Sequence, residues 1–176
     1  MECARSQVIP RTPRRLNEVP ERLENYEKMR GFYRGAVRLA NGVCAIIFIL
    51  TAMLPYLNEA TVLEADGIFR CVSTIPVMKQ LYTIHIRIFS KSIPGILMLT
   101  DCMEEIMYTE KLLSVVRIVP ALRNNVMSIM LDFERAAMNA FTAVFPNIIL
   151  SGCYFHYVRA VMQKFYKLKI WEAGAS

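Results

Sequence analysis

The sequence predicts an α/β (α+β) protein, a mixed β-sheet flanked by helices, and three observations support this prediction. Residues 80–89 (QLYTIHIRIF) alternate between apolar and polar side chains, which is typical of a strand with one buried face. Residues 133–144 place apolar side chains at i, i+3, i+4 and i+7, which is typical of an amphipathic helix. The expected strands come first and then alternate with helices, in the order β-β-β-α-β-α-β-α. That order favours a mixed sheet with helices packed on it.

The expected elements divide the chain into three parts. Residues 1–41 form a charged N-terminal segment, partly helical over 19–40, residues 42–170 form the domain, and residues 171–176 form a tail. Strands are expected at 46–49, at 60–66, at 68–73 after a tight break at Gly67, and at 80–89. Further strands are expected at 91–101, as an edge strand, at 124–132 and at 147–152. Helices are expected at 104–119, with Ile106, Met107, Leu113 and Val116 inside, from Phe133 until Pro146, and at the end of the domain, where Phe155, Val158, Met162 and Phe165 face inward.

Composition indicates a folded chain. Its 176 residues suffice for one domain with a hydrophobic core. Hydrophobic residues make up 55% of the chain and charged residues 20%, which excludes a disordered protein. The net charge of +6 permits a polyanionic partner such as nucleic acid but does not require one.

The cysteines and the N-terminus predict an intracellular protein. The five cysteines are scattered, are odd in number and contain no Cys-x-x-Cys pair. The polar, charged N-terminus differs from a secretory signal. A reducing location, nuclear or cytoplasmic, is therefore expected rather than secretion.

One uncharged run leaves a membrane hypothesis open. Residues 42–57 carry no charge, and an anchor over 39–57 would make this a small membrane protein. A spanning helix needs about 20 apolar residues, and this run is shorter and contains Pro55. Its β-branched centre, 46–49, also suits a buried strand, which is the favoured interpretation.

Two aspartates are the candidate functional residues. Asp66 ends one expected strand and Asp132 ends another, and residues at the ends of neighbouring strands meet at one edge of a sheet. Two adjacent carboxylates repel each other unless a cation lies between them, and hard oxygen ligands suit Mg²⁺ or Mn²⁺. The alternative roles are structural. Asp66-Gly67 is a common turn pair, Asp132 can cap the following helix, and Glu134 can complement its dipole.

Two stretches of the sequence resemble a known family. The stretches DGIFRCVSTIPVMKQLYTIHI and MLDFERAAMNAFTAVFPNIILSGCYFHYVRAVMQ are similar to the transposase domain of Mutator-like elements (MULE). The resemblance covers roughly residues 42–168, with the motifs in the same order and at similar separations. It implies an RNase H-like fold and metal-dependent cleavage and transfer of DNA strands by a three-carboxylate, two-metal centre. Asp66 resembles the first metal ligand and Asp132 the second.

The same resemblance brings in Cys153 and His156, which match the family's Cys-x-x-His. Thiolate and imidazole could bind Zn²⁺, but two ligands do not complete a tetrahedral site, and packing at the start of the last helix is the favoured interpretation. His85, on an alternating strand, is expected to be structural. The outward cations of the last helix could contact phosphates or simply be solvated (Arg159, Lys164, Lys167 and Lys169).

The chain also departs from the family pattern. The family's third carboxylate lies beyond the Cys-x-x-His segment, where this chain has only Glu172 in an unmatched tail, and Ile68 replaces a threonine. We therefore expect an RNase H-like domain that is incomplete at its C-terminus and inactive alone. Its expected partners are DNA and another protein chain, either a second copy of this chain or a full-length transposase. The alternative is a non-catalytic DNA- or protein-binding module domesticated from a transposon.

Overall fold

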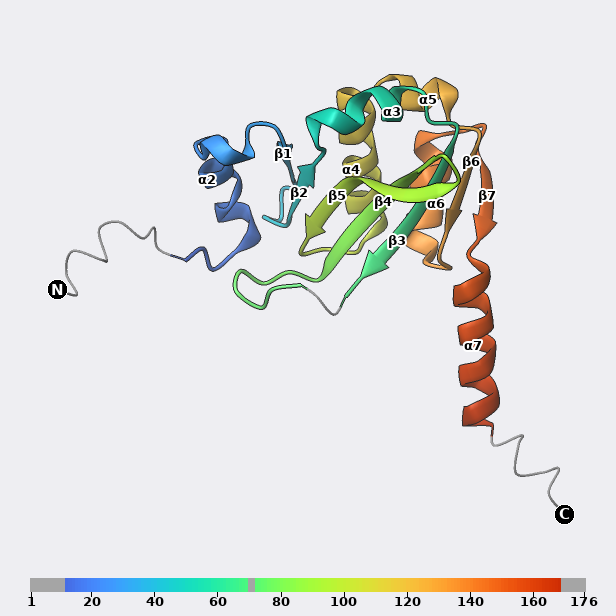
Figure 1. The fold of residues 1–176 in the computed structure, drawn as a ribbon. Coiled ribbons are helices and arrows are strands. Elements are labelled where there is room, and N and C mark those ends of the chain that lie inside the picture. Colours follow the sequence, from blue (N-terminus) through green and yellow to red (C-terminus); the bar gives the residue numbers. More distant parts are fainter. Residues whose placement is uncertain (1–11, 70–71, 169–176) are drawn as a thin grey trace, which may run out of the picture.

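The fold is built on one seven-stranded sheet. The computed structural model describes residues 12–69 and 72–168 (Figure 1). The strands follow the order β1-β2-β5-β4-β3-β6-β7 across the sheet. Their bounds are β1 Tyr33–Arg38, β2 Cys44–Phe48, β3 Val62–Ile68, β4 Gln80–Ile88, β5 Lys91–Thr100, β6 Ser128–Leu131 and β7 Ile149–Gly152.

The sheet contains both antiparallel and parallel pairs. Strands β3, β4 and β5 form an antiparallel meander, in which Asp66 pairs with Thr83. Strand β6 runs parallel to β3, with Leu131 opposite Ala65, and β7 runs parallel to β6. Parallel neighbours require crossover connections, and helices supply them here. The predicted mixed α/β architecture is therefore confirmed.

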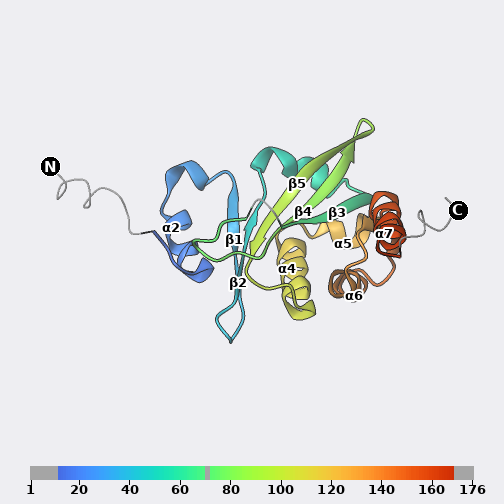
Figure 2. The same cartoon turned by 90° about the horizontal axis from the view of Figure 1, so that it is seen from below.

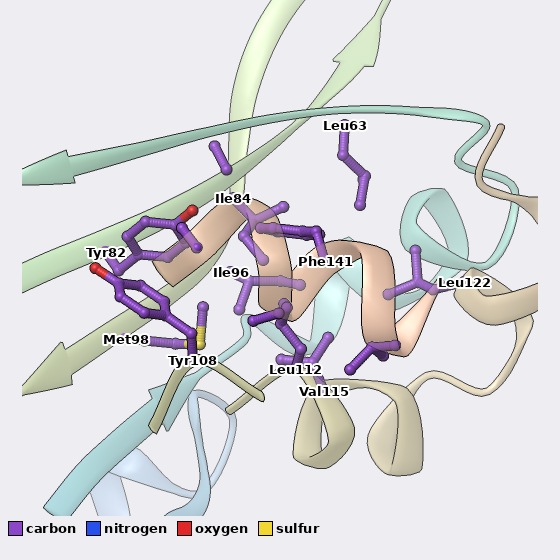
Figure 3. Close-up of a cluster of buried hydrophobic side chains, with 14 of the residues drawn as sticks. Leu63, Tyr82, Ile84, Ile96, Met98, Tyr108, Leu112, Val115, Leu122 and Phe141 are labelled. Atoms are coloured by element: carbon purple, nitrogen blue, oxygen red, sulfur yellow. The ribbon is translucent and has the colours of Figure 1, made fainter. Parts of the chain in front are cut away.

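Two of the helices cover one face of the sheet. The helices are α2 Pro20–Glu24, α3 Leu54–Asn58, α4 Glu105–Ile118, α5 Ala121–Asn125, α6 Arg135–Val144 and α7 Tyr154–Lys167, with short 3₁₀ turns at Leu16–Glu18, Glu27–Met29 and Thr51–Met53. Helices α4 and α6 lie side by side on the same face (Figure 2). Their apolar side chains meet those of β3, β4 and β5 in one buried cluster, which includes Leu63, Ile84, Ile96, Leu112 and Phe141 (Figure 3).

The N-terminal segment departs from the predicted helix over 19–40. Only a short helix, α2, and a 3₁₀ turn form there, and Tyr33–Arg38 is strand β1. Strand β1 pairs with β2, so the sheet extends across the boundary predicted at residue 42. The segment is held by a second apolar cluster, in which Leu16 packs with Cys44, Ile46 and Phe48. The apolar residues of this segment have helical spacing, but strand pairing with β2 and packing in the second cluster outweighed that local preference. Contacts with distant residues cannot be predicted from a local pattern.

Two strand predictions are corrected in detail. Gly67 lies inside β3, paired with Tyr82, instead of breaking the chain into two strands. The strand at 91–101, which was expected at an edge of the sheet, is β5 and lies between β2 and β4. The run at 46–49 falls in β2, whose five residues are all buried, as the strand interpretation predicted. Among the residues that the structure describes, we find no helix with the length and apolar content that a membrane crossing requires.

The inward faces of the helices were predicted less well. Helix α4 buries Met107, Tyr108, Lys111, Leu112 and Val115, whereas Ile106 is exposed. Phe133 is exposed as well. Helix α7 extends away from the sheet and buries none of its residues, so its predicted inward residues are not part of the core (Figure 1). Periodicity identifies an apolar face but not the structure that covers it.

Candidate functional site

Asp66 lies near the end of β3, on the face of the sheet opposite the core. Its carboxylate accepts a hydrogen bond from the backbone N–H of Gly67 at 2.8 Å, and its backbone carbonyl accepts one from the Thr83 hydroxyl at 3.3 Å. A side chain at position 67 would collide with the amide of Gln80, so this position needs glycine for close approach. The Asp66 side chain is 47% exposed and can reach a ligand from solvent.

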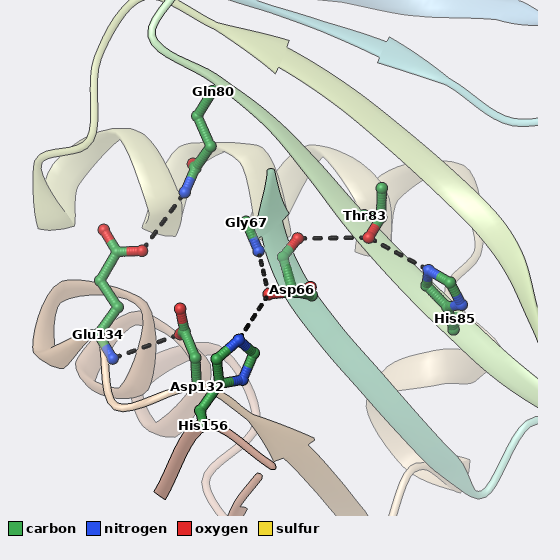
Figure 4. A network of polar contacts seen from close by, with 8 residues as sticks. All are labelled: Asp66, Gly67, Gln80, Thr83, His85, Asp132, Glu134 and His156. Carbon is green, nitrogen blue, oxygen red and sulfur yellow. Dashed lines mark hydrogen bonds and ion pairs between the residues drawn. The ribbon is translucent and has the colours of Figure 1, made fainter. Parts of the chain in front are cut away.

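Asp132 lies directly after β6, beside Asp66. Because Leu131 pairs in parallel with Ala65, the next residue of each strand falls at the same edge of the sheet. The side chains of Asp66 and Asp132 lie near each other at this edge, with the ring of His156 beside them (Figure 4). Burial raises the pKa of Asp132, and the negative charge of Asp66 raises it further, while the backbone N–H of Glu134 opposes the shift. Sequence analysis thus predicted which residues meet at this edge.

His156 joins the two aspartates from the first turn of α7. Its Nε2 lies 3.8 Å from Oδ1 of Asp66, close enough for an ion pair when the imidazole is protonated (Figure 4). Its Nδ1 is buried and has no hydrogen-bond partner among the described residues. Cys153 occupies the cap position before α7 without a side-chain capping bond. The start of α7 therefore contributes to the same site as the aspartates.

A cavity of about 250 Å³ opens beside Asp66. Both histidines of the chain line it, together with Glu64, Ala65, Asp66, Ser92, Met130, Cys153 and Phe155. The two nitrogens of His85 lie 3.2 Å from the hydroxyls of Thr83 and Ser92, so this ring is hydrogen-bonded within the sheet. That environment suits the structural role expected for His85.

Glu134, for which an interaction with the helix dipole was the favoured interpretation, also makes side-chain hydrogen bonds that the sequence did not predict. It is the N-terminal cap residue of α6 but makes no side-chain capping bond. Its carboxylate turns toward the sheet instead, where both oxygens lie 2.9 Å from the hydroxyl of Tyr108 and one lies 3.4 Å from the amide of Gln80. Burial raises the pKa of Glu134, although the hydrogen bond from Tyr108 opposes this.

Sequence reasoning missed the buried residues beneath Glu134. Lys111 is fully buried, with its ammonium 3.9 Å from the ring centre of Tyr108 and 4.9 Å from that of Tyr82. Burial lowers the pKa of Lys111 to about 7, although the charge of Glu134 opposes the shift. A lysine on an amphipathic helix is normally assigned to the solvent side, so the only signal was its position between the apolar residues of α4.

The donor set fits a hard divalent cation only in part. Asp66 and Asp132 supply carboxylate oxygens, which suit Mg²⁺ or Mn²⁺ better than Zn²⁺. Within residues 12–69 and 72–168, no group of three or more His, Cys, Asp or Glu side chains is arranged to hold a metal ion. The arrangement can therefore offer two oxygen ligands and leave the remaining positions of a cation to water or to a substrate phosphate.

The predicted phosphate contacts lie apart from this cluster. Arg159, Lys164 and Lys167 are exposed on α7, which begins at the site and extends away from it (Figure 1). Lys169 lies outside the described residues.

Comparison of this chain with family models, with curated proteins and with solved structures finds no match. What the fold itself defines is the class, a mixed α/β protein with a seven-stranded sheet flanked by helices.

Proposed function

We propose that this chain derives from a DNA transposase of the Mutator-like kind and that Asp66 and Asp132 bind a divalent cation, Mg²⁺ or Mn²⁺. The observation that carries the proposal is the meeting of these two carboxylates at the ends of the parallel neighbours β3 and β6. Two half-exposed carboxylates in mutual repulsion are stabilised when a cation binds between them.

The strand order supports the finer description of the fold as RNase H-like. An antiparallel meander of three strands (β3, β4 and β5) is followed by two strands parallel to the first (β6 and β7), each entered through helices. In this arrangement the first acid lies on the first strand of the meander and the second acid at the end of its parallel neighbour. The sequence resemblance implies the same placement for Asp66 and Asp132.

Each described residue of the site has a defined role in this proposal. Asp66 and Asp132 hold the cation, and the backbone N–H of Glu134, 3.3 Å from Oδ1 of Asp132, orients the second carboxylate. When bound, the cation would activate a water or hydroxyl and stabilise the leaving oxygen of a phosphodiester. Two protein ligands hold a cation more weakly than three, so we expect weak binding and no DNA cleavage by the chain alone.

The test is titration with Mn²⁺ alone, followed by electron paramagnetic resonance or calorimetry. We expect one weak site, and the variant Asp132→Asn should lose it. The matched control is Glu110→Gln, because Glu110 lies on the surface of α4 and pairs only at 3.9 Å with Arg117. Equal Mn²⁺ binding by Asp132→Asn and by the unmodified chain would refute the proposed site.

A second candidate function, nucleic-acid binding without catalysis, is favoured by the surface of α7. This projecting helix carries the cations Arg159, Lys164 and Lys167 and also exposed aromatic rings, which lie mostly near its start (Tyr154, Phe155 and Tyr157, with Tyr166 near its end). Cations that track a phosphate backbone, combined with aromatic rings on which bases stack, are typical of surfaces that bind single strands.

This candidate is tested by the salt dependence of binding to a single-stranded oligothymidine. Each phosphate contact that is lost lowers the slope of log K against log salt by roughly 0.7 for single strands, so Arg159→Gln, Lys164→Gln and Lys167→Gln together should lower it by about 2. The matched control replaces three exposed cations elsewhere, Lys28, Lys79 and Lys91, by glutamine. If both triple variants lower the slope equally, α7 is not the binding surface and only general basicity remains.

A further inference from the structure

A buried hydrogen-bonded cluster lies directly beneath the turn that carries Asp132. The hydroxyl of Tyr108 lies 2.7 Å from the side-chain oxygen of Gln80 and 2.9 Å from both carboxylate oxygens of Glu134. The amide of Gln80 donates to Glu134 at 3.4 Å. Gln80 is 0% exposed and Tyr108 is 1% exposed, so these bonds are shielded from solvent.

The cluster joins three elements that are distant in sequence. Gln80 begins β4, Tyr108 lies in the first turn of α4, and Glu134 lies in the turn between β6 and α6. The ring of Tyr108 is in turn held edge-on against Tyr82, at 5.1 Å between ring centres, with the ammonium of Lys111 over both rings. A ring fixed by packing holds its hydroxyl oxygen in one place, so Glu134 is bound to a rigid support.

Glu134 transmits this rigidity to Asp132. The two residues are separated by one position, and the N–H of Glu134 donates to Oδ1 of Asp132 at 3.3 Å. Phe133 between them is exposed, and its ring lies beside Tyr157 of α7 and not in the main core cluster. The hydrogen bonds of the Glu134 side chain therefore connect the buried interior to the turn that carries Asp132, in addition to the pairing of Leu131 in β6.

We infer that Tyr108 and Gln80 are positioning residues for cation binding, because through Glu134 they hold Asp132 in its place beside Asp66. This inference rests on the proposed function. Partners in the outer shell of a metal site orient its ligands, and their loss typically lowers metal affinity by 10–100-fold. In this role Glu134 accepts hydrogen bonds from Tyr108 and Gln80 and is not itself required to bind the cation.

The experiment measures Mn²⁺ affinity in Tyr108→Phe, Glu134→Ala and the double variant. We expect about a tenfold or greater loss in each single variant. The Mn²⁺ affinity of the double variant should be no lower than that of the single variant with the larger loss, because both changes break the same contact. Glu134→Gln, which keeps an acceptor for the Tyr108 hydroxyl, should retain most of the affinity. Purely structural damage would produce losses that multiply in the double variant.

The matched control is Tyr33→Phe. The Tyr33 hydroxyl also donates a hydrogen bond to a glutamate, Glu24, at 3.4 Å. Tyr33 lies in β1, the edge strand at the end of the sheet away from β3 and β6. This variant should bind Mn²⁺ like the unmodified chain. Circular dichroism on every variant confirms that the comparison is made between folded proteins.

A second measurement requires no cation. Hydrogen exchange of the Glu134 backbone amide, which is bonded to Asp132, should accelerate in Tyr108→Phe and stay unchanged in Tyr33→Phe. The inference is overturned if hydrogen exchange is unchanged in Tyr108→Phe. It is also overturned if Tyr108→Phe binds Mn²⁺ as tightly as the unmodified chain while Asp132→Asn does not bind it. Both outcomes leave the proposed cation site standing. Absence of Mn²⁺ binding by the unmodified chain overturns the proposed function, and the inference with it.

Discussion

Asp66 and Asp132 lie far apart in the chain but near each other at one edge of the sheet, because β3 and β6 run parallel with Ala65 opposite Leu131. The negative charge of Asp66 raises the pKa of Asp132, so the pair is under electrostatic strain when no cation is present. Burial is the larger cause of that shift.

Asp132→Asn should therefore stabilise the protein at neutral pH in the absence of a divalent cation. A carboxylate whose pKa is raised on folding contributes its full stability below its ordinary pKa of 3.8, and that contribution is lost as the pH rises through the folded value. Thermal unfolding should show a higher midpoint for Asp132→Asn than for the unmodified chain at pH 7, with the gap closing near pH 3. A lower midpoint at pH 7 would contradict this expectation.

Lys111→Met should raise the free energy of unfolding, most strongly at low pH. Folding lowers the pKa of Lys111 from 10.5 to about 7, so between these values the unfolded chain binds more protons and stability rises with pH. Below pH 7 the folded protein carries a buried ammonium without a hydrogen-bond partner. Methionine removes this penalty, on the order of a few kcal/mol, and the pH dependence with it.

Urea denaturation at pH 6 and pH 8.5 checks this expectation. Lys91→Met is the control, since Lys91 is exposed at the start of β5. The same rise in stability from pH 6 to pH 8.5 in Lys111→Met and in the unmodified chain would show that Lys111 is not the titrating group.

Tyr82→Phe should stabilise the protein by roughly 1–3 kcal/mol, because it removes a buried hydroxyl that has no hydrogen-bond partner among the described residues. The ring contacts with Tyr108 and the core would remain. Chemical denaturation measures the difference, and Tyr56→Phe, at an exposed position of α3, is the neutral control. A loss of stability would mean that the hydroxyl of Tyr82 has a partner, such as a bound water.

Gly67→Ala should destabilise the protein by about 1–3 kcal/mol, as overpacking in a filled interior does. The new methyl group would meet the fully buried amide of Gln80 and push it away from Glu134. In Gly31→Ala the methyl group would meet only the Thr51 hydroxyl at 3.7 Å, an ordinary contact, so this variant is the matched control. Equal stability of the two variants would show that Gln80 can move freely.

The cysteines should differ in reactivity toward iodoacetamide. Burial raises the pKa of the Cys44 thiol to about 11, and its side chain is 0% exposed, so it should react only after unfolding. Cys153 is partly exposed at the start of α7 and should react in the folded protein. Peptide mass mapping distinguishes the two sites, and labelling in urea supplies the control. Rapid labelling of Cys44 in the native state would contradict the packing of β2.

Local sequence patterns predicted much of the sheet and of the site. The alternation of residues 80–89 and the apolar run at 46–49 correspond to β4 and β2, because alternating apolar side chains and short β-branched runs both favour a strand. Asp66 and Asp132 were recognisable because each follows an apolar strand sequence. The patterns failed where burial depends on a distant partner. Residues 33–38 became an edge strand through pairing with β2, and the interior face of α4 is centred on Tyr108 and Lys111.

The sequence by itself determined the alternation of strands and helices, the mixed sheet and the two aspartates at strand ends, since these follow from interactions between near neighbours in the chain. Only the tertiary structure decided that Lys111 is buried against two tyrosine rings and that Glu134 turns inward to Tyr108 and Gln80. Removing a charge from water is unfavourable unless specific neighbours surround it, and those neighbours come from β4 and α4. That dependence on remote contacts is the physical reason why the support of the site could not be inferred from local sequence.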